Sequence, residues 1–186
     1  MNAKPPKIAS LLVFVVVAAL ISQAGSAEEG TRETGRKPYV SFSGAHSKIE
    51  RQSYELITSA DDWAKLWHRH LGKELKGNYD YFYNPEGIPA VDFDSCMVIA
   101  IMRGKQINVA GIEVVMMGKI AGLMTVRFRD KTFQTFGTAK DNGGARATTP
   151  YGFFVVPNSP NAIVLEQHDA QYKNDPPKWR KVFRFR

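Results

Sequence analysis

The sequence predicts a mainly β domain of the α+β class: an antiparallel β-sandwich or partly closed barrel with one N-terminal helix packed on it. Three observations predict this fold. About seven or eight short strand-like segments follow one another every ~8–12 residues. Only residues 59–72 show helical periodicity instead. Because Cys96 is the sole cysteine, no internal disulfide can form, and apolar packing must hold the domain together.

The amino terminus has the layout of a secretory signal peptide. Lys4 and Lys7 precede an apolar run over residues 8–21, and small residues at 24–27 precede two glutamates. The apolar run is shorter than the ~20 residues that a membrane-spanning helix needs. We therefore predict a signal peptide over residues 1–27, export to the periplasm or beyond the cell, and no transmembrane segment after cleavage. The alternative is an uncleaved membrane anchor.

The rest of the chain divides into a leader and a single domain. Residues 28–38 are polar and lack periodicity, which predicts a flexible leader. Residues 39–186 have the length of one domain. The formal net charge is +7, but the basic residues are scattered along the sequence, so nucleic acid is not a predicted partner.

The predicted helix has clear start and stop signals. Ser59 can cap its first turn, where Asp61 and Asp62 suit the positive end of the helix dipole. Apolar and aromatic residues then recur at positions 63, 66, 67, 70 and 71, forming one stripe that predicts packing on a sheet. Gly72 can adopt the left-handed conformation that ends a helix.

The predicted strands differ in their burial pattern. Residues 97–102 are continuously apolar, which is typical of a central strand buried on both faces. Residues 124–129 alternate cleanly, and residues 112–117 are expected to place Ile112, Val114 and Met116 on one face. Further strands are predicted at 39–43, 53–58, 151–156 and 162–166, a self-packed aromatic loop at 77–89 and a turn at 141–144.

The carboxy-terminal segment predicts a last strand with a basic outer face. Alternate residues of a strand face the same way, so the odd-numbered residues are expected on one face: Trp179, Lys181, Phe183 and Phe185. The opposite, outer face is expected to carry the even-numbered residues Arg180, Arg184 and Arg186. Such charges also protect an exposed sheet edge from pairing with other chains.

The sequence contains none of the common motifs of hydrolases, nucleotide enzymes or paired-cysteine metal sites. His68 and His70 are two positions apart on the helix and so point to nearly opposite sides, one onto the stripe and one into water. Asp92 and Asp94 are too few for a calcium site and are interpreted as a polar turn that holds Phe93 in the core. No cofactor and no metal is predicted.

Two polar, glycine-bearing segments, residues 103–111 and 138–149, flank the predicted sheet. Loops held by a rigid sheet commonly carry binding residues, although these two could also be ordinary hairpin connections. Glycine inside a strand often marks a bulge or a close backbone approach. The candidate binding residues are Arg103, Lys105, Gln106, Gly111, Asp141 and Arg146.

Several short pieces of the sequence occur in the same order as in a known family. They are SADDWAKLW at 59–67, VDF at 91–93, MVIA at 97–100 leading to Gly104, and TPY at 149–151. Over residues 59–157 the chain thus resembles the carboxy-terminal domain type of PrcB, an accessory subunit of secreted protease complexes. That family usually has a Thr-Gly-Gly-Tyr-like turn, where this sequence has VAGI at 109–112.

The resemblance implies a non-catalytic exported module. Our first functional hypothesis is therefore a binding or accessory domain whose partner is another exported protein or peptide, associated with a protease or with the cell envelope. Two alternatives remain open. One is an enzyme with an unrecognised site that uses Asp92, Asp94 or His168. The other is a structural envelope protein whose basic tail binds polyanions.

Overall fold

The structure is a computed structural model that describes residues 35–169 and 177–186, without the side chains of residues 139–141. The predicted signal peptide and most of the predicted leader lie outside these residues. Within the described part, no helix is long and apolar enough to cross a membrane. The described chain contains two four-stranded sheets, one small two-stranded sheet and one α-helix.

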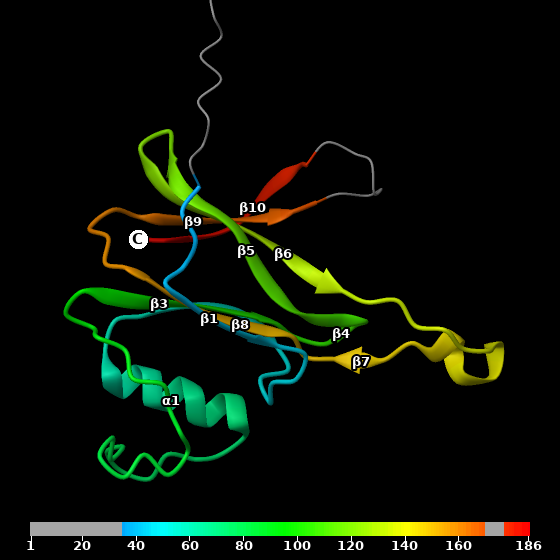
Figure 1. Cartoon of the computed structure of the whole chain (residues 1–186), viewed down its shortest axis with the longest axis horizontal. Helices are drawn as coiled ribbons and strands as arrows, with labels where there is room; N and C mark the ends of the chain where they lie inside the picture. The colour runs from blue at the N-terminus through cyan, green and yellow to red at the C-terminus, as the bar shows by residue number, and fades with distance from the viewer. Residues whose placement is uncertain (1–34, 170–176) are drawn as a thin grey trace, which may run out of the picture. The chain divides into compact units, whose positions relative to one another are not determined.

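The two large sheets form a sandwich, which confirms the predicted fold class (Figure 1). Sheet 1 has the order β1 (Val40–Gly44), β8 (Tyr151–Pro157), β3 (Cys96–Arg103) and β2 (Gln52–Ile57). Sheet 2 has the order β10 (Trp179–Phe185), β9 (Ile163–His168), β6 (Leu123–Thr132) and β5 (Val109–Ile120). The short strands β4 (Gln106–Ile107) and β7 (Ala147–Thr148) pair with each other. All strand pairs are antiparallel except β6 with β9, which the sequence did not predict.

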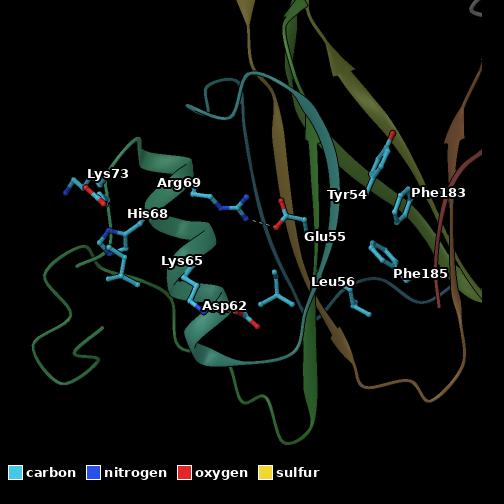
Figure 2. Close-up of a pocket in the computed structure, with 13 residues that line it drawn as sticks. Tyr54, Glu55, Leu56, Asp62, Lys65, His68, Arg69, Lys73, Phe183 and Phe185 are labelled. Carbon is cyan, nitrogen blue, oxygen red and sulfur yellow. Dashed lines mark hydrogen bonds and ion pairs between the residues drawn. The ribbon is translucent and has the colours of Figure 1, made fainter. Parts of the chain in front are cut away.

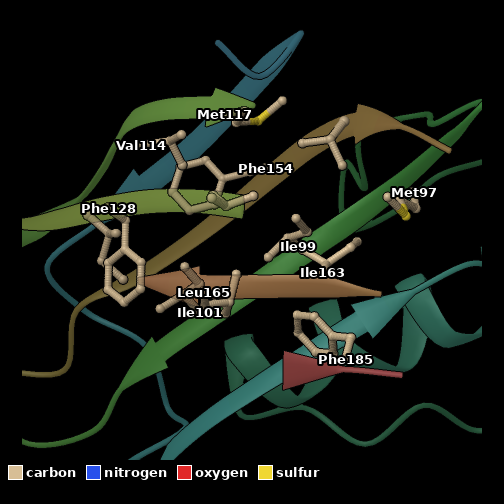
Figure 3. Close-up of a cluster of buried hydrophobic side chains, with 13 residues drawn as sticks. Met97, Ile99, Ile101, Val114, Met117, Phe128, Phe154, Ile163, Leu165 and Phe185 are labelled. Carbon is tan, nitrogen blue, oxygen red and sulfur yellow. The ribbon is translucent and has the colours of Figure 1, made fainter. Parts of the chain in front are cut away.

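The main core lies between the two sheets, and Figure 3 shows it filled by aliphatic and aromatic side chains. β3 contributes Met97, Ile99 and Ile101 to this core, while its intervening residues face the helix side of sheet 1. Both faces of β3 are therefore buried, as the continuous apolar run over 97–102 predicted. Across the sandwich, Ile163 and Leu165 of β9 meet these side chains.

The helix α1 (Ala60–Leu71) covers the other face of sheet 1 and is capped as predicted. The Ser59 hydroxyl accepts a hydrogen bond from the Asp62 amide, and Gly72 ends the helix at φ 70°. Trp63 is fully buried against sheet 1, with its ring centroid 5.2 Å from that of Phe153. The sandwich thus has a third layer, held by a second apolar cluster between helix and sheet.

The prediction that one helix histidine faces water is wrong, because both are buried. His70 packs between α1 and sheet 1, with its ring centroid 4.1 Å from that of Tyr151. His68 points to the opposite side, where Tyr79 covers it at a centroid distance of 5.6 Å. The aromatic loop that follows α1 therefore packs on the helix itself. The helical periodicity does not show that the loop which follows the helix folds back over its outer face.

The predicted orientation of the carboxy-terminal strand is also wrong, because β10 contains a bulge between Lys181 and Phe183. Phe183 and Phe185 pair with the inward-facing Leu165 and Ile163. Trp179, however, pairs with His168 and contacts Arg127 on the outer face of sheet 2. An extra residue in a strand moves every residue beyond it to the opposite face of the sheet. Simple alternation along the sequence therefore predicts the wrong face for Trp179 relative to Phe183.

A second bulge has the same effect in β5. The register shifts between Val114 and Met116, so Met117, rather than Met116, joins Ile112 and Val114 in the core between the sheets. Met116 is nevertheless buried, at 8% exposure. The predicted alternation over residues 112–117 therefore holds only as far as Val114.

The last residues of the predicted leader belong to the folded domain. Arg36 exchanges two backbone hydrogen bonds of 2.9 Å with Met117 of β5, and the Lys37 ammonium donates to the Val114 carbonyl at 2.8 Å. The chain then enters β1 in sheet 1. This segment joins the two sheets along the side of the sandwich formed by β1 and β5, and on the opposite side Tyr54 of β2 lies beside Phe183 of β10.

Candidate functional site

A groove of about 850 Å³ lies beside β2, between α1 and the edge of β10 (Figure 2). We call it the β2 groove. Its floor and walls come from β2, from α1 with the residues that follow it, and from β10, which lies at the other end of the domain sequence. The lining residues are Tyr54, Glu55, Leu56, Ile57, Asp62, Lys65, His68, Arg69, Lys73, Glu74, Leu75, Phe183 and Phe185.

The backbone along this groove is the free edge of a sheet. In the described part of the chain, β2 has one strand neighbour, β3, which pairs with it from Gln52 to Ile57. An edge strand directs every second pair of amide and carbonyl groups away from its neighbour. These groups of β2 therefore point toward the groove, where an extended chain could hydrogen-bond to them.

One wall of the groove is apolar. Tyr54 and Leu56 leave β2 on the sandwich side, where the Tyr54 ring lies 5.2 Å from that of Phe183. Phe183 is 39% exposed, although it stands on the core face of sheet 2. An aromatic side chain that is part buried and part open can take further apolar contacts without losing those it already has.

The other wall is charged and is formed by α1. Arg69 contacts Glu55 of β2 at 2.6 Å, and Lys65 contacts Asp62 at 3.1 Å. Figure 2 shows Arg69 reaching from the helix to Glu55 across the groove. Both pairs are partly exposed, so each is a weak stabiliser that a ligand could rearrange at little cost. A ligand in the groove would therefore meet apolar side chains on one wall and charged side chains on the other.

His68 borders the charged wall and carries unsatisfied polar atoms. Neither of its ring nitrogens has a hydrogen-bond partner among the described residues, although the residue is only 6% exposed. The nearest acid is Glu86, with the Glu86 Oε2 atom 3.9 Å from the His68 Nε2 atom. This distance is too long for a hydrogen bond. Figure 2 places His68 on the side of α1 away from β2.

Arg103, predicted as a binding residue, is engaged in a structural ion pair. Its guanidinium binds both carboxylate oxygens of Asp130 at 3.0–3.3 Å, and the two side chains are only 11% and 18% exposed. The Gln167 amide also donates to Asp130, at 3.4 Å. The pair joins β3 of sheet 1 to β6 of sheet 2 inside the sandwich.

The two predicted binding loops do meet, through the pairing of β4 with β7. The Arg146 amide donates to the Asn108 side chain at 2.8 Å, and Gln106 pairs with Thr148. Lys105 makes an exposed ion pair with Glu50 at 2.7 Å. Asp141 lies in the 3-10 turn η1 (Ala139–Gly144), and its side chain is outside what the structure describes. A ligand role for these residues stays a prediction.

Gly111 is required by a close approach between the sheets, as its position inside a strand predicted. It lies at a bulge with φ 151°, where a Cβ atom would come within 2.5 Å of the Ser43 hydroxyl oxygen. That hydroxyl accepts a hydrogen bond from the Ile112 amide at 2.6 Å. Gly111 therefore allows β1 to bond to β5 across the sandwich.

The structure separates the residues of the enzyme hypothesis. Asp92 accepts hydrogen bonds from the Ser95 hydroxyl and the Asp94 amide in a turn before β3. These bonds, the Ser95 bond above all, lower the pKa of Asp92. Asn158, directly after β8, bonds to this turn. His168 lies at the far end of β9, roughly 17 Å from the start of that strand at ~3.3 Å per residue. Among described residues, no group of three or more potential metal ligands occurs.

Burial of His70 predicts an acid-sensitive fold. Removal from water lowers the pKa of His70 below its ordinary 6.5, while its Nδ1 atom lies 3.0 Å from the Ser47 hydroxyl. The unfolded chain therefore binds a proton more readily than the folded one, and this contribution to stability is lost as pH falls below about 6.5. We expect urea unfolding to show a free energy that decreases from pH 7.5 to 5.5.

Two histidine variants test this expectation. His70→Gln should flatten the dependence of unfolding free energy on pH, whatever its effect on stability at pH 7.5. His46→Gln, at an exposed position, should leave the slope unchanged. An unchanged slope in His70→Gln would show that another group causes the acid sensitivity.

Sequence reasoning missed the β2 groove, although it found the strand and the helix that form it. The signal available was the pattern at 52–57, where Tyr54 and Leu56 alternate with polar residues. Nothing in the sequence shows that β2 takes an edge position or that Phe183 comes to lie beside Tyr54.

The fold and the groove define a β-sandwich domain with a helix on one face and an open strand edge. In comparisons with known proteins, the chain matches no family model, and no curated protein or solved structure matches it significantly. The resemblance to the PrcB carboxy-terminal domain type stays a prediction.

Proposed function

We propose that this protein is an exported binding module that takes up an extended segment of another exported protein along β2. The observation that carries the proposal is the free edge of β2 at the side of an 850 Å³ groove. Strand addition to an exposed sheet edge is a common mode of peptide recognition, in which backbone hydrogen bonds supply affinity. The compartment follows from the predicted signal peptide.

The two walls of the groove suggest which segment would bind. Side chains of an added strand point alternately to the two faces of the sheet. On one face they would meet Tyr54 and Phe183, and on the other Lys65 and Arg69 of α1. A segment that alternates aromatic or aliphatic residues with polar ones would therefore match both walls.

Backbone-modified peptides can test strand addition directly. Peptides of about eight residues, the length of a strand, would be selected by phage display and synthesised with N-methyl groups on either the odd or the even residues. We expect one of the two methylated series to lose binding and the other to retain it, because only alternate amides of an added strand face β2. Equal tolerance of both series would contradict strand addition.

A matched pair of variants tests the location. Phe183→Asp should weaken binding of the selected peptide about 10- to 30-fold, as expected for an aromatic residue at the centre of a contact. Phe82→Ala, which alters an aromatic residue that is 88% exposed on the loop after α1, should leave binding unchanged. Isothermal titration calorimetry provides both values. Unchanged affinity in Phe183→Asp would place the peptide elsewhere.

A further inference from the structure

A second surface, the outer face of sheet 2, collects basic side chains from strands that are distant in sequence. Alternation along β6 and the bulge in β10 direct five cations to this face. They are Arg127, Arg129, Lys131, Lys181 and Arg184, which we call the basic face. The sequence prediction expected basic residues on the last strand, but it neither joined them to β6 nor placed Lys181 among them.

Acidic residues neutralise only part of this face. Arg127 pairs with Glu166 at 2.9 Å, and Arg129 pairs with Glu113 at 2.8 Å. Lys131, Lys181 and Arg184 are exposed, and none of them has an ion-pair partner among the described residues. The face therefore has more cations than carboxylates, and all three unpaired cations are accessible to solvent. Such an excess attracts anionic ligands.

The spacing of the unpaired cations fits a long ligand. From the strand register, Arg184 lies beside Val164 of β9, which neighbours Thr125 of β6. Lys131 is six residues beyond Thr125 on β6, a distance of roughly 20 Å at ~3.3 Å per residue. Lys181 lies between these ends, beside Glu166. A small anion could reach one of these cations, whereas a linear polymer could contact all three.

The placement of aromatic side chains around the basic face favours a polysaccharide ligand over a nucleic acid. Proteins that bind single-stranded nucleic acids stack the bases on exposed aromatic side chains. Among the outward-facing residues of β5, β6, β9 and β10, the aromatic rings are those of Trp179 and His168, and Arg127 lies over the Trp179 ring at 5.2 Å from its centroid. That face of the ring is not free for a base. The Phe side chains of β6 and β10 face the sandwich core instead: Phe128, Phe183 and Phe185.

We propose that the basic face binds a linear anionic polysaccharide, with Lys131, Lys181 and Arg184 as its principal contacts. The ligand class is a sugar polymer with regularly spaced sulfate, phosphate or carboxylate groups. This site is separate from the β2 groove and rests on a different observation. It would hold the protein on an anionic envelope or matrix polymer while the groove stays open to a peptide.

Heparin is the probe for this site. The variant Lys131→Gln/Lys181→Gln/Arg184→Gln should elute from immobilised heparin at clearly lower NaCl than the unaltered protein. In solution, the slope of log affinity against log salt should fall by about two to three, because each ionic contact contributes ~0.7–0.9. The matched control is Lys48→Gln/Lys76→Gln/Lys119→Gln, which removes the same charge from exposed positions elsewhere. It should retain most of the salt slope.

Three results would overturn the proposal. The control variant could lose as much affinity as the test variant, which would make net charge the cause. Inorganic sulfate at matched charge could compete as well as heparin, which would contradict a polymer contact. A duplex or single-stranded DNA of equal charge could bind more tightly than heparin, which would indicate a nucleic acid. Unchanged thermal melting and unchanged binding of the groove peptide would show that the test variant is folded and that the two sites are independent.

Discussion

Trp63→Ala is expected to lower the free energy of unfolding by about 3–5 kcal/mol, the range for removing a large aromatic side chain from a core. Trp63 is fully buried, and its ring contacts Trp67 and Phe153 at centroid distances of 5.2 Å. Its indole nitrogen donates to the Pro89 carbonyl at 2.9 Å, so the substitution also frees the loop that covers α1. Urea titration followed by circular dichroism measures the loss.

Phe82→Ala is the control for Trp63→Ala, because Phe82 belongs to the same loop but is 88% exposed. Its effect should stay within about 0.5 kcal/mol, as for most surface substitutions. If Trp63→Ala were equally mild, α1 would not be anchored on sheet 1, and the charged wall of the β2 groove would lose its support. The outcome therefore bears on the proposed peptide site as well as on the fold.

Arg103→Ala is expected to destabilise the domain by up to about 3 kcal/mol, the lower end of the range for breaking a buried ion pair, because it leaves the Asp130 carboxylate, whose side chain is 18% exposed, without its cation. The neighbouring Lys105→Ala removes an exposed ion pair with Glu50 and should change the midpoint of urea unfolding very little. Both residues were candidate binding residues on the same loop. The comparison therefore distinguishes a residue that stabilises the fold, Arg103, from a nearby exposed residue that does not, Lys105.

A double variant refines this test. Arg103→Met/Asp130→Leu replaces both members of the pair with apolar side chains of similar length and should recover part of the stability lost in Arg103→Ala. Recovery is expected to be incomplete, because the Gln167 amide would lose its acceptor. If the double variant were no more stable than Arg103→Ala, the uncompensated charge would not be the main cost.

Local patterns predicted the elements well where one physical cause dominates. The helix follows from its apolar stripe and from the caps at Ser59 and Gly72, and all three are present. The central strand β3 follows from its unbroken apolar run, and both of its faces are buried. These features depend on residues close together in the chain, so the sequence displays them directly.

Prediction failed where a loop contact or a register shift changed the surroundings of a residue. His68 is polar and lies off the apolar stripe, yet Tyr79 buries it. Trp179 and Phe183 share parity, yet the β10 bulge places them on opposite faces. Neither the loop contact nor the register shift can be seen in the periodicity on which the two wrong predictions depended.

By itself, the sequence determined the class of this protein: a β-rich domain with one capped amphipathic helix, behind a segment that predicts export. Only the tertiary structure decided which strand became an edge, which aromatic side chains met across the sandwich, and which basic residues gathered on one face. Secondary structure arises from neighbours in the chain, whereas the β2 groove and the basic face arise from strand order and register. Those depend on the simultaneous packing of the whole domain.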